Sequence, residues 1–154
     1  MAYPFRPLSH QRPNTLHRTD DRPVETSDWA SVEDDIEIVR RTRANVLVTG
    51  AEFQVTKVTR RLVADASAVV GIPCQAKPLP LFPLPVARAI VLFRDIDTLD
   101  AEGQALLLQW LESVTADQII VSTASASLLP AVMAGTFDRQ LYYRLNTIYI
   151  KLGE

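Results

Sequence analysis

Apolar residues along this chain form short uninterrupted runs separated by longer stretches of mixed character. The runs at 46–49, 90–93, 118–123 and 147–152 are bounded by glycine, acidic or polar residues. Continuous apolar runs of this length are typical of strands that are buried on both faces. The pattern therefore predicts four strands of a covered sheet.

Between these runs, apolar residues recur at steps of three and four, which predicts helices with one buried face. The first helix starts at a cap on Ser27 or Asp28 and runs through Arg41, and the second follows Gly50. The expected buried positions of these two helices are Trp29, Val32, Ile36 and Val39, and then Val58, Leu62, Ala66 and Val69. Arg60, Arg61 and Asp65 are expected to face water.

A third helix is expected from a cap at Asp100 through Val114, and short helices around 128–134 and before the last strand. The apolar arc of the third helix is wider than one sheet face needs. Leu106 and Trp110 lie on its flank, so they either cover a neighbouring element or contact a partner.

Strands that alternate with helices of ten or more residues imply right-handed crossovers and a mostly parallel sheet. The predicted fold class is α/β, a three-layer sandwich. It is assigned to one domain over residues 29–154, because 154 residues are too few for two sizeable domains.

Two segments depart from this pattern. Residues 1–28 hold four of the ten prolines, few aliphatic residues and balanced charge, which predicts a disordered tail, with a binding segment as the alternative. Five prolines lie between Pro73 and Pro85, and they exclude a helix or a central strand there. This segment is expected to be an extended surface linker or, alternatively, a ligand for an aromatic-lined groove.

Composition narrows the possible chemistry. Both histidines, His10 and His17, lie in the tail, and Cys74 is the only cysteine. Histidine-based nucleophilic catalysis, metal sites built on cysteine or histidine, and internal disulfides are therefore not expected. A net charge of −2 gives no overall basic field, so direct nucleic-acid binding is not expected either. With no apolar run of about 18 residues, the chain is expected to be cytoplasmic and to lack a membrane segment.

Residues 46–69 form a strand, a glycine and a helix, which is the setting of a phosphate-binding loop. Such a loop needs glycines so that backbone amides converge on phosphate oxygens, a lysine for the β and γ phosphates, and a hydroxyl group for magnesium. The strand at 90–93 ends in Arg94, Asp95 and Asp97. Two carboxylates at a strand end could perform acid–base work, or they could be solvated or cap a helix.

Three segments, VLVTGAEFQVTK, IVLFRDID and GTFDRQLYYRLNTIYIKL, together resemble the ATPase core of the sigma-54-dependent transcription activators, a branch of the AAA+ proteins. The resemblance implies a P-loop NTPase-like core and spans about 28–152. It is strongest at Leu141–Asn146. The chain stops where the helical lid of the family would begin, and the proline-rich segment replaces a long insertion that in the family touches the sigma factor.

The residues at the nucleotide-binding positions differ from those of the family. The family loop reads Gly-Glu-Ser-Gly-Thr-Gly-Lys-Glu. Laid on without a gap, Gly50 matches the first glycine, Phe53 and Val55 replace the inner glycines, Thr56 replaces the lysine, and Lys57 replaces the residue after it. A shift by one residue would recruit Lys57 but would place Arg60 on the buried face of the helix.

The other functional positions of the family differ as well. By the resemblance, Arg94 takes the place of the aspartate that orients magnesium, Asp95 that of the glutamate that prepares water, and Ala124 that of an asparagine that senses the γ-phosphate. Of the two arginines that reach a neighbouring subunit, Asp138 replaces the first, Arg139 is displaced by one position and Arg144 is retained. Arg139 and Arg144 are candidates for a subunit interface, although the retained segment also fits simple core packing.

The sequence therefore predicts a non-catalytic AAA+-like module of the sigma-54 activator type. It is expected to bind a protein partner or itself, with regulation as one role open to it, and to use no metal or cofactor. The alternative is a residual regulator that binds ATP with Mg²⁺ through Lys57 and still interacts with the sigma-54 machinery. A DNA-binding regulator is a third reading, weakened by the lack of a recognisable helix-turn-helix.

Overall fold

The computed structural model describes residues 29–153, apart from 78, 82–88 and 115–117. The predicted disordered tail and the helix cap at Ser27 or Asp28 lie outside the described residues. So do residues 78 and 82–85 of the stretch predicted to be extended between Pro73 and Pro85.

Five parallel strands form one sheet in the order β2-β3-β4-β1-β5. In chain order they are β1 (Val46–Thr49), β2 (Val69–Pro73), β3 (Ile90–Arg94), β4 (Ile119–Ala124) and β5 (Ile148–Lys151). The three inner strands are almost wholly buried, as their continuous apolar runs predict. The expected parallel α/β sheet is confirmed.

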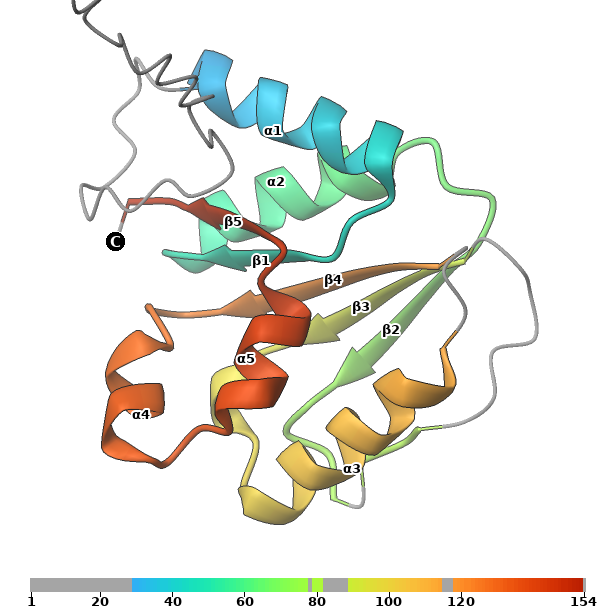
Figure 1. Cartoon of the computed structure of the whole chain (residues 1–154). Helices are drawn as coiled ribbons and strands as arrows, with labels where there is room; N and C mark the ends of the chain where they lie inside the picture. The colour runs from blue at the N-terminus through green and yellow to red at the C-terminus, as the bar shows by residue number, and fades with distance from the viewer. Residues whose placement is uncertain (1–28, 78, 82–88, 115–117, 154) are drawn as a thin grey trace, which may run out of the picture.

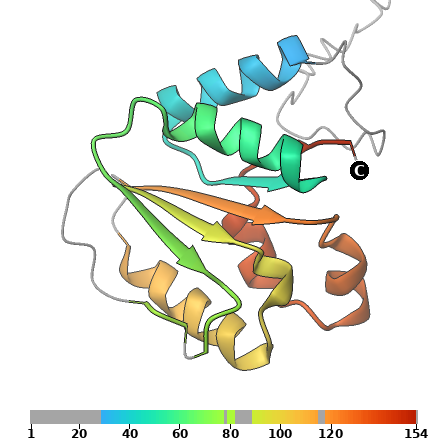
Figure 2. The same ribbon diagram turned by 180° about the vertical axis from the view of Figure 1, so that it is seen from behind.

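Helices cover both faces of the sheet (Figure 1). On one face lie α1 (Trp29–Thr42) and α2 (Glu52–Val63), and on the other α3 (Ala101–Ser113), α4 (Leu129–Ala134) and α5 (Arg139–Leu145). The view from behind shows the same three layers (Figure 2). Two separate apolar clusters fill the spaces between the layers, one on each face of the sheet.

The prediction was wrong between residues 64 and 73. Helix α2 ends at Val63, and Val69, expected on its buried stripe, begins β2 and is 44% exposed. Only Ile72 of the five β2 residues is buried, so the strand has neither an apolar run nor a clear alternation. Pro73 ends this strand at the margin of the sheet, where a missing amide donor is tolerated.

The proline-rich segment is anchored to the core at the described residues Cys74 and Leu79. Leu79 is buried in the cluster beneath the sheet, and Leu81 packs against that cluster. The segment is therefore not only a surface linker. Whether it binds an aromatic-lined groove stays a prediction.

Trp110 covers an element of its own chain. Its ring meets Phe93 of β3 edge to face, with centroids 5.4 Å apart. Leu106, the other flank residue, remains 39% exposed. Packing within the chain therefore explains why the apolar arc of α3 extends to Trp110.

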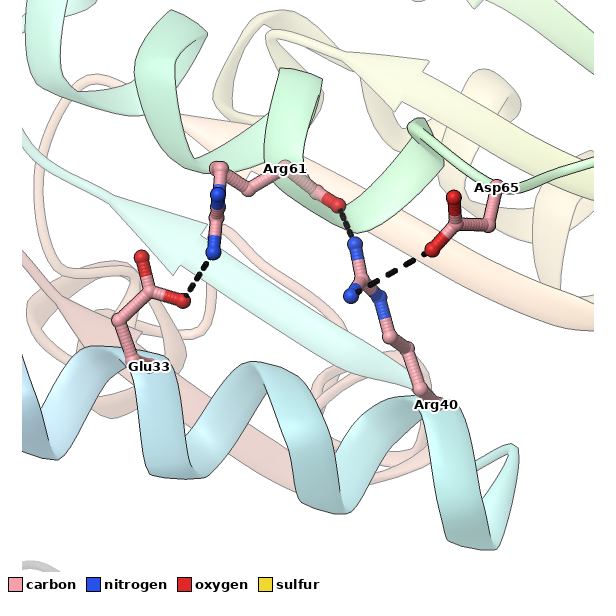
Figure 3. Close-up of polar contacts among 4 residues, drawn as sticks. All are labelled: Glu33, Arg40, Arg61 and Asp65. Atoms are coloured by element: carbon pink, nitrogen blue, oxygen red, sulfur yellow. Dashed lines mark hydrogen bonds and ion pairs between the residues drawn. The ribbon is translucent and has the colours of Figure 1, made fainter.

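Polar contacts join α1 to α2 along their exposed rims (Figure 3). Nη2 of Arg61 donates to Oε2 of Glu33 at 2.6 Å, and Arg40 donates to the carbonyl oxygen of Arg61 and lies 3.7 Å from Asp65. Ion pairs as exposed as these contribute about 0.2–1 kcal/mol each. The buried faces of the two helices therefore supply most of the attachment.

None of the helices in the described part of the chain is long and apolar enough to cross a membrane.

Candidate nucleotide cleft

An open cleft of about 650 Å³ lies at the carboxyl ends of the central strands, beside α2. Ligands of open parallel sheets bind at this edge, where the connections diverge to the two faces. The residues that line it from the strands and the loops after them include Gly50, Arg94, Asp95, Asp97, Thr123, Ala124 and Ser125. The structure thus brings the residues expected from the loop, the acidic strand end and the sensor position to one place.

The backbone at the phosphate-loop position is not a loop. Strand β1 ends at Thr49, and α2 begins at Glu52, after only Gly50 and Ala51. The amide of Gly50 donates to the Ala124 carbonyl oxygen at 3.2 Å, and the amide of Ala51 donates to the Gly153 carbonyl oxygen at 3.1 Å. These two amides are therefore already used in joining β1 to its neighbours.

Gly50 is required here for a structural reason. Its φ of +142° is rare for any other residue, and an added Cβ would lie 2.8 Å from Cβ of Leu152. The glycine allows the chain to pass close to the end of β5 as it leaves β1. The single matching glycine of the expected loop thus serves a close backbone approach.

The remaining loop positions belong to helix α2 and point in different directions. Phe53 is 81% exposed, Val55 is buried and lines the cleft, and Thr56 also lines it. Nζ of Lys57 lies 4.1 Å from the ring centroid of Trp29 in α1, a cation–π contact. Lys57 does not line the cleft, so the arrangement that would recruit it for phosphate is not present.

The end of β3 is organised by a tight turn at Asp95, whose φ of 59° is left-handed. Its amide donates to Oγ1 of Thr123 at 3.1 Å, and its carboxylate accepts from Nε2 of Gln75 at 3.4 Å. The exposed Arg94 lines the cleft. Among the described residues its side chain forms no hydrogen bond or ion pair.

Asp97 joins this turn to the end of β4. Its Oδ2 accepts from Oγ of Ser125 at 2.5 Å and from the Ser125 amide at 3.3 Å. The two carboxylates therefore hold adjacent loops together, as expected if they are structural and not an acid–base pair. Thr123, Ser125 and Gln75 were not among the predicted site residues. For Thr123 and Ser125 the available signal was their position at the end of the strand predicted over 118–123, whereas Gln75 follows β2, which was not predicted.

Cys74 lies near Asp95 and Asp97, and its surroundings make its thiol unreactive. Burial, assisted by the charges of Asp95 and Asp97, raises the pKa of its thiol to about 12. At pH 8 the group is thus almost wholly the unreactive thiol. We expect iodoacetamide to alkylate Cys74 at least about tenfold more slowly in the native chain than in urea, by mass spectrometry. Equal rates would show that the thiol is accessible.

The segment before α5 is held by capping. Oδ1 of Asp138 accepts from the Leu141 amide at 2.8 Å, and the Asp138 amide donates to Oε1 of Gln104 at 2.7 Å. Asp138 therefore starts α5 where the family carries an arginine. Nη2 of Arg144 donates to the Leu111 carbonyl oxygen at 3.2 Å, at the end of α3, and Arg139 is exposed. Arg144 thus has a role within the chain, and the subunit-interface role of both arginines stays a prediction.

We expect Asp138→Ala to lower the free energy of unfolding by about 1 kcal/mol, because the first turn of α5 loses its cap. Urea unfolding followed by circular dichroism measures this loss. Asp138→Asn is the matched variant, since asparagine caps equally well. A loss of similar size in both variants would contradict the capping role.

The residues present do not fit a magnesium nucleoside triphosphate. Helix α2 occupies the positions of the glycine-rich loop whose amides would converge on phosphate. The first turn of the helix also carries Glu52, which has the same sign of charge as phosphate. Arg94 places a positive charge where magnesium needs a carboxylate. No group of three or more metal-binding side chains occurs in the part of the chain that is described.

Comparison with known proteins agrees with the fold. The structure is similar to NtrX from Brucella abortus bound to ATP, with 20% identity, a TM-score of 0.68 and coverage of 88% of this chain and 39% of that one. RuvB T158V from Thermotoga maritima matches with 14% identity and a TM-score of 0.54, over 84% of this chain and 45% of that one.

The P-loop NTPase domain of an Escherichia coli sigma-54 activator matches with 16% identity and a TM-score of 0.52, over 81% of this chain and 96% of that one. At these identities the matches establish the fold, an AAA+ P-loop NTPase core, and the chain spans less than half of NtrX. No curated protein sequence matches significantly. The model of the sigma-54 interaction domain, however, matches residues 25–154. With strand order, cleft position and family match in agreement, the chain belongs to the sigma-54 interaction domain family.

Proposed function

We propose that this chain is a non-catalytic AAA+ module of the sigma-54 activator type that acts by binding protein in the cytoplasm. The observation that carries the proposal is the start of α2 at Glu52, two residues after Gly50. A helix that starts this early leaves no glycine-rich loop whose successive amides could wrap around a triphosphate. The charge of Arg94 at the magnesium position supports the same conclusion.

Residues at the family's functional positions, and residues next to them, make structural contacts within this chain. Asp97 clasps Ser125, the Ala124 carbonyl oxygen accepts from Gly50, and Asp138 caps α5. Each of these contacts stabilises a junction between elements. The α/β core is thereby retained without the groups that hydrolysis needs.

The catalytic part of the proposal is tested by steady-state ATP hydrolysis with Mg²⁺. We expect phosphate release no faster than in a buffer blank, in the wild type and in Lys57→Ala alike. Turnover by the wild type that Lys57→Ala abolishes would establish the alternative, an ATP-binding regulator that uses Lys57. Turnover that survives in Lys57→Ala would also contradict the proposal.

The binding part of the proposal is tested by affinity capture from native extract, in parallel with Mg·ATP and with EDTA. We expect the same protein to be retained under both conditions, because recognition does not pass through a nucleotide. Retention only with Mg·ATP would contradict this, and so would retention of no specific protein.

A further inference from the structure

We propose that two copies of this chain associate through the outer edges of their β2 strands, antiparallel about a two-fold axis at Val70. The proposal goes beyond the function proposed above, since it requires only the shape and polarity of the β2 edge. Within the described part of the chain, strand β2 ends the sheet and has β3 as its single neighbour (Figure 1). Such an edge is a template for a further strand.

The backbone groups that face outward follow from the register with β3. The Ile90 amide donates to the Ala68 carbonyl oxygen, and the Cys74 amide donates to the Arg94 carbonyl oxygen, both at 3.0 Å. Even-numbered β2 residues therefore bond to β3, and the amides and carbonyls of Val69 and Gly71 point away from the sheet. Across the described residues no backbone group bonds to these four.

A second copy of β2 satisfies this edge completely. With a two-fold axis at Val70, Val69 of one copy faces Gly71 of the other, and each such pair exchanges two N–H···O bonds. Four donors then meet four acceptors. Pro73, which has no amide hydrogen and whose carbonyl oxygen already accepts from Ala76 at 3.2 Å, lies outside the pairing.

The side chains suit self-association as well. Val69 is 44% exposed, and a Cβ on Gly71 would meet nothing within 4 Å, so each glycine leaves room for the valine opposite it. The strand has no charged residue, so two copies bring no like charges together. Charged side chains usually protect an exposed strand edge from pairing with another chain, and β2 has none.

The pairing region is small compared with the roughly 1,600 Å² buried in standard stable complexes. We therefore expect weak association, with a dissociation constant on the order of 100 µM. Sedimentation velocity of the full chain up to about 1 mM should show a concentration-dependent dimer. A monomer throughout that range overturns the proposal. The proposal is overturned even if the edge then pairs with a strand from another protein.

Charge substitutions test the register. Val69→Lys/Gly71→Lys and Val69→Glu/Gly71→Glu place like charges opposite each other, and each should weaken association at least about tenfold. An equimolar mixture of the two variants should associate again through opposite charges. Val69→Glu/Gly71→Lys should remain a dimer on its own, because glutamate then faces lysine in this register.

Both positions are exposed and Gly71 does not have a positive φ, so these variants should melt within a few degrees of the wild type. Ala105→Lys, on the exposed side of α3, is the matched control and should leave association unchanged. A dimer that persists in the double-lysine variant, or a mixture that stays monomeric, would overturn the β2 pairing.

Discussion

Gln104→Glu is expected to lower the free energy of unfolding by about 3–5 kcal/mol, because it places an unpaired charge in a buried site. Gln104 is 5% exposed, and its amide nitrogen donates to the carbonyl oxygens of Leu99 and Thr136, both at 3.1 Å. Its Oε1 accepts from the Asp138 amide at 2.7 Å. A glutamate would direct a carboxylate at two carbonyl oxygens. Urea denaturation at pH 7 measures the change.

Two variants separate charge from hydrogen bonding at this site. Gln104→Met keeps the volume but leaves three buried or part-buried backbone groups without this partner, so we expect a loss of about 1–3 kcal/mol. Gln109→Glu, exposed on the same helix, should change stability by less than about 0.5 kcal/mol. A loss below about 1 kcal/mol for Gln104→Glu would show that Gln104 does not hold the start of α5.

Phe93→Ala is expected to cost about 3–5 kcal/mol of unfolding free energy. The ring has no exposed surface and lies between the sheet and α3, in edge-to-face contact with Trp110. Truncation removes buried apolar surface, leaves a cavity and breaks the aromatic pair. Thermal unfolding by calorimetry and urea titration should both show the loss.

Phe53→Ala is the control for this substitution, since the same side chain is 81% exposed there. It should change stability by less than about 0.5 kcal/mol. A large loss in Phe53→Ala would mean that Phe53 is buried in solution. A small loss in Phe93→Ala would contradict the packing of α3 against the sheet.

The inner strands and the fold class were predictable because a strand that is buried on both faces consists of a continuous run of apolar residues. Strands β1, β3 and β4 lie within one residue of their expected bounds, and Asp100 caps α3 by accepting from the Gly103 amide at 2.8 Å. The family was predictable from the segment that forms α5 and β5. These features depend on local pattern alone.

Strand β2 was not predictable from local pattern, because an edge strand with three exposed residues and a central glycine has no period to detect. The contact made by the Lys57 side chain could not be predicted either, because it depends on the position of Trp29 in another helix, α1. Which residues replaced the family's groups could be read from the sequence. What they now contact, as with Asp138 and the Leu141 amide, required the structure.

The same residues account for how the fold is kept under the loss of nucleotide binding that we propose. Helix α2 begins directly after β1 and takes the place of a glycine-rich loop that would wrap around phosphate. Asp95 and Asp97 then stabilise the neighbouring turn by hydrogen bonds to residues of β4 and the loop after it. We infer that the cleft is stable without a bound ligand.

Isothermal titration calorimetry with ATP and with ADP, each with and without Mg²⁺, tests the central claim most directly. We predict no saturable heat at nucleotide concentrations up to about 1 mM, in the wild type and also in Arg94→Asp, because restoring one carboxylate does not restore the loop that α2 replaces. Magnesium-dependent binding with micromolar affinity in the wild type would contradict the account.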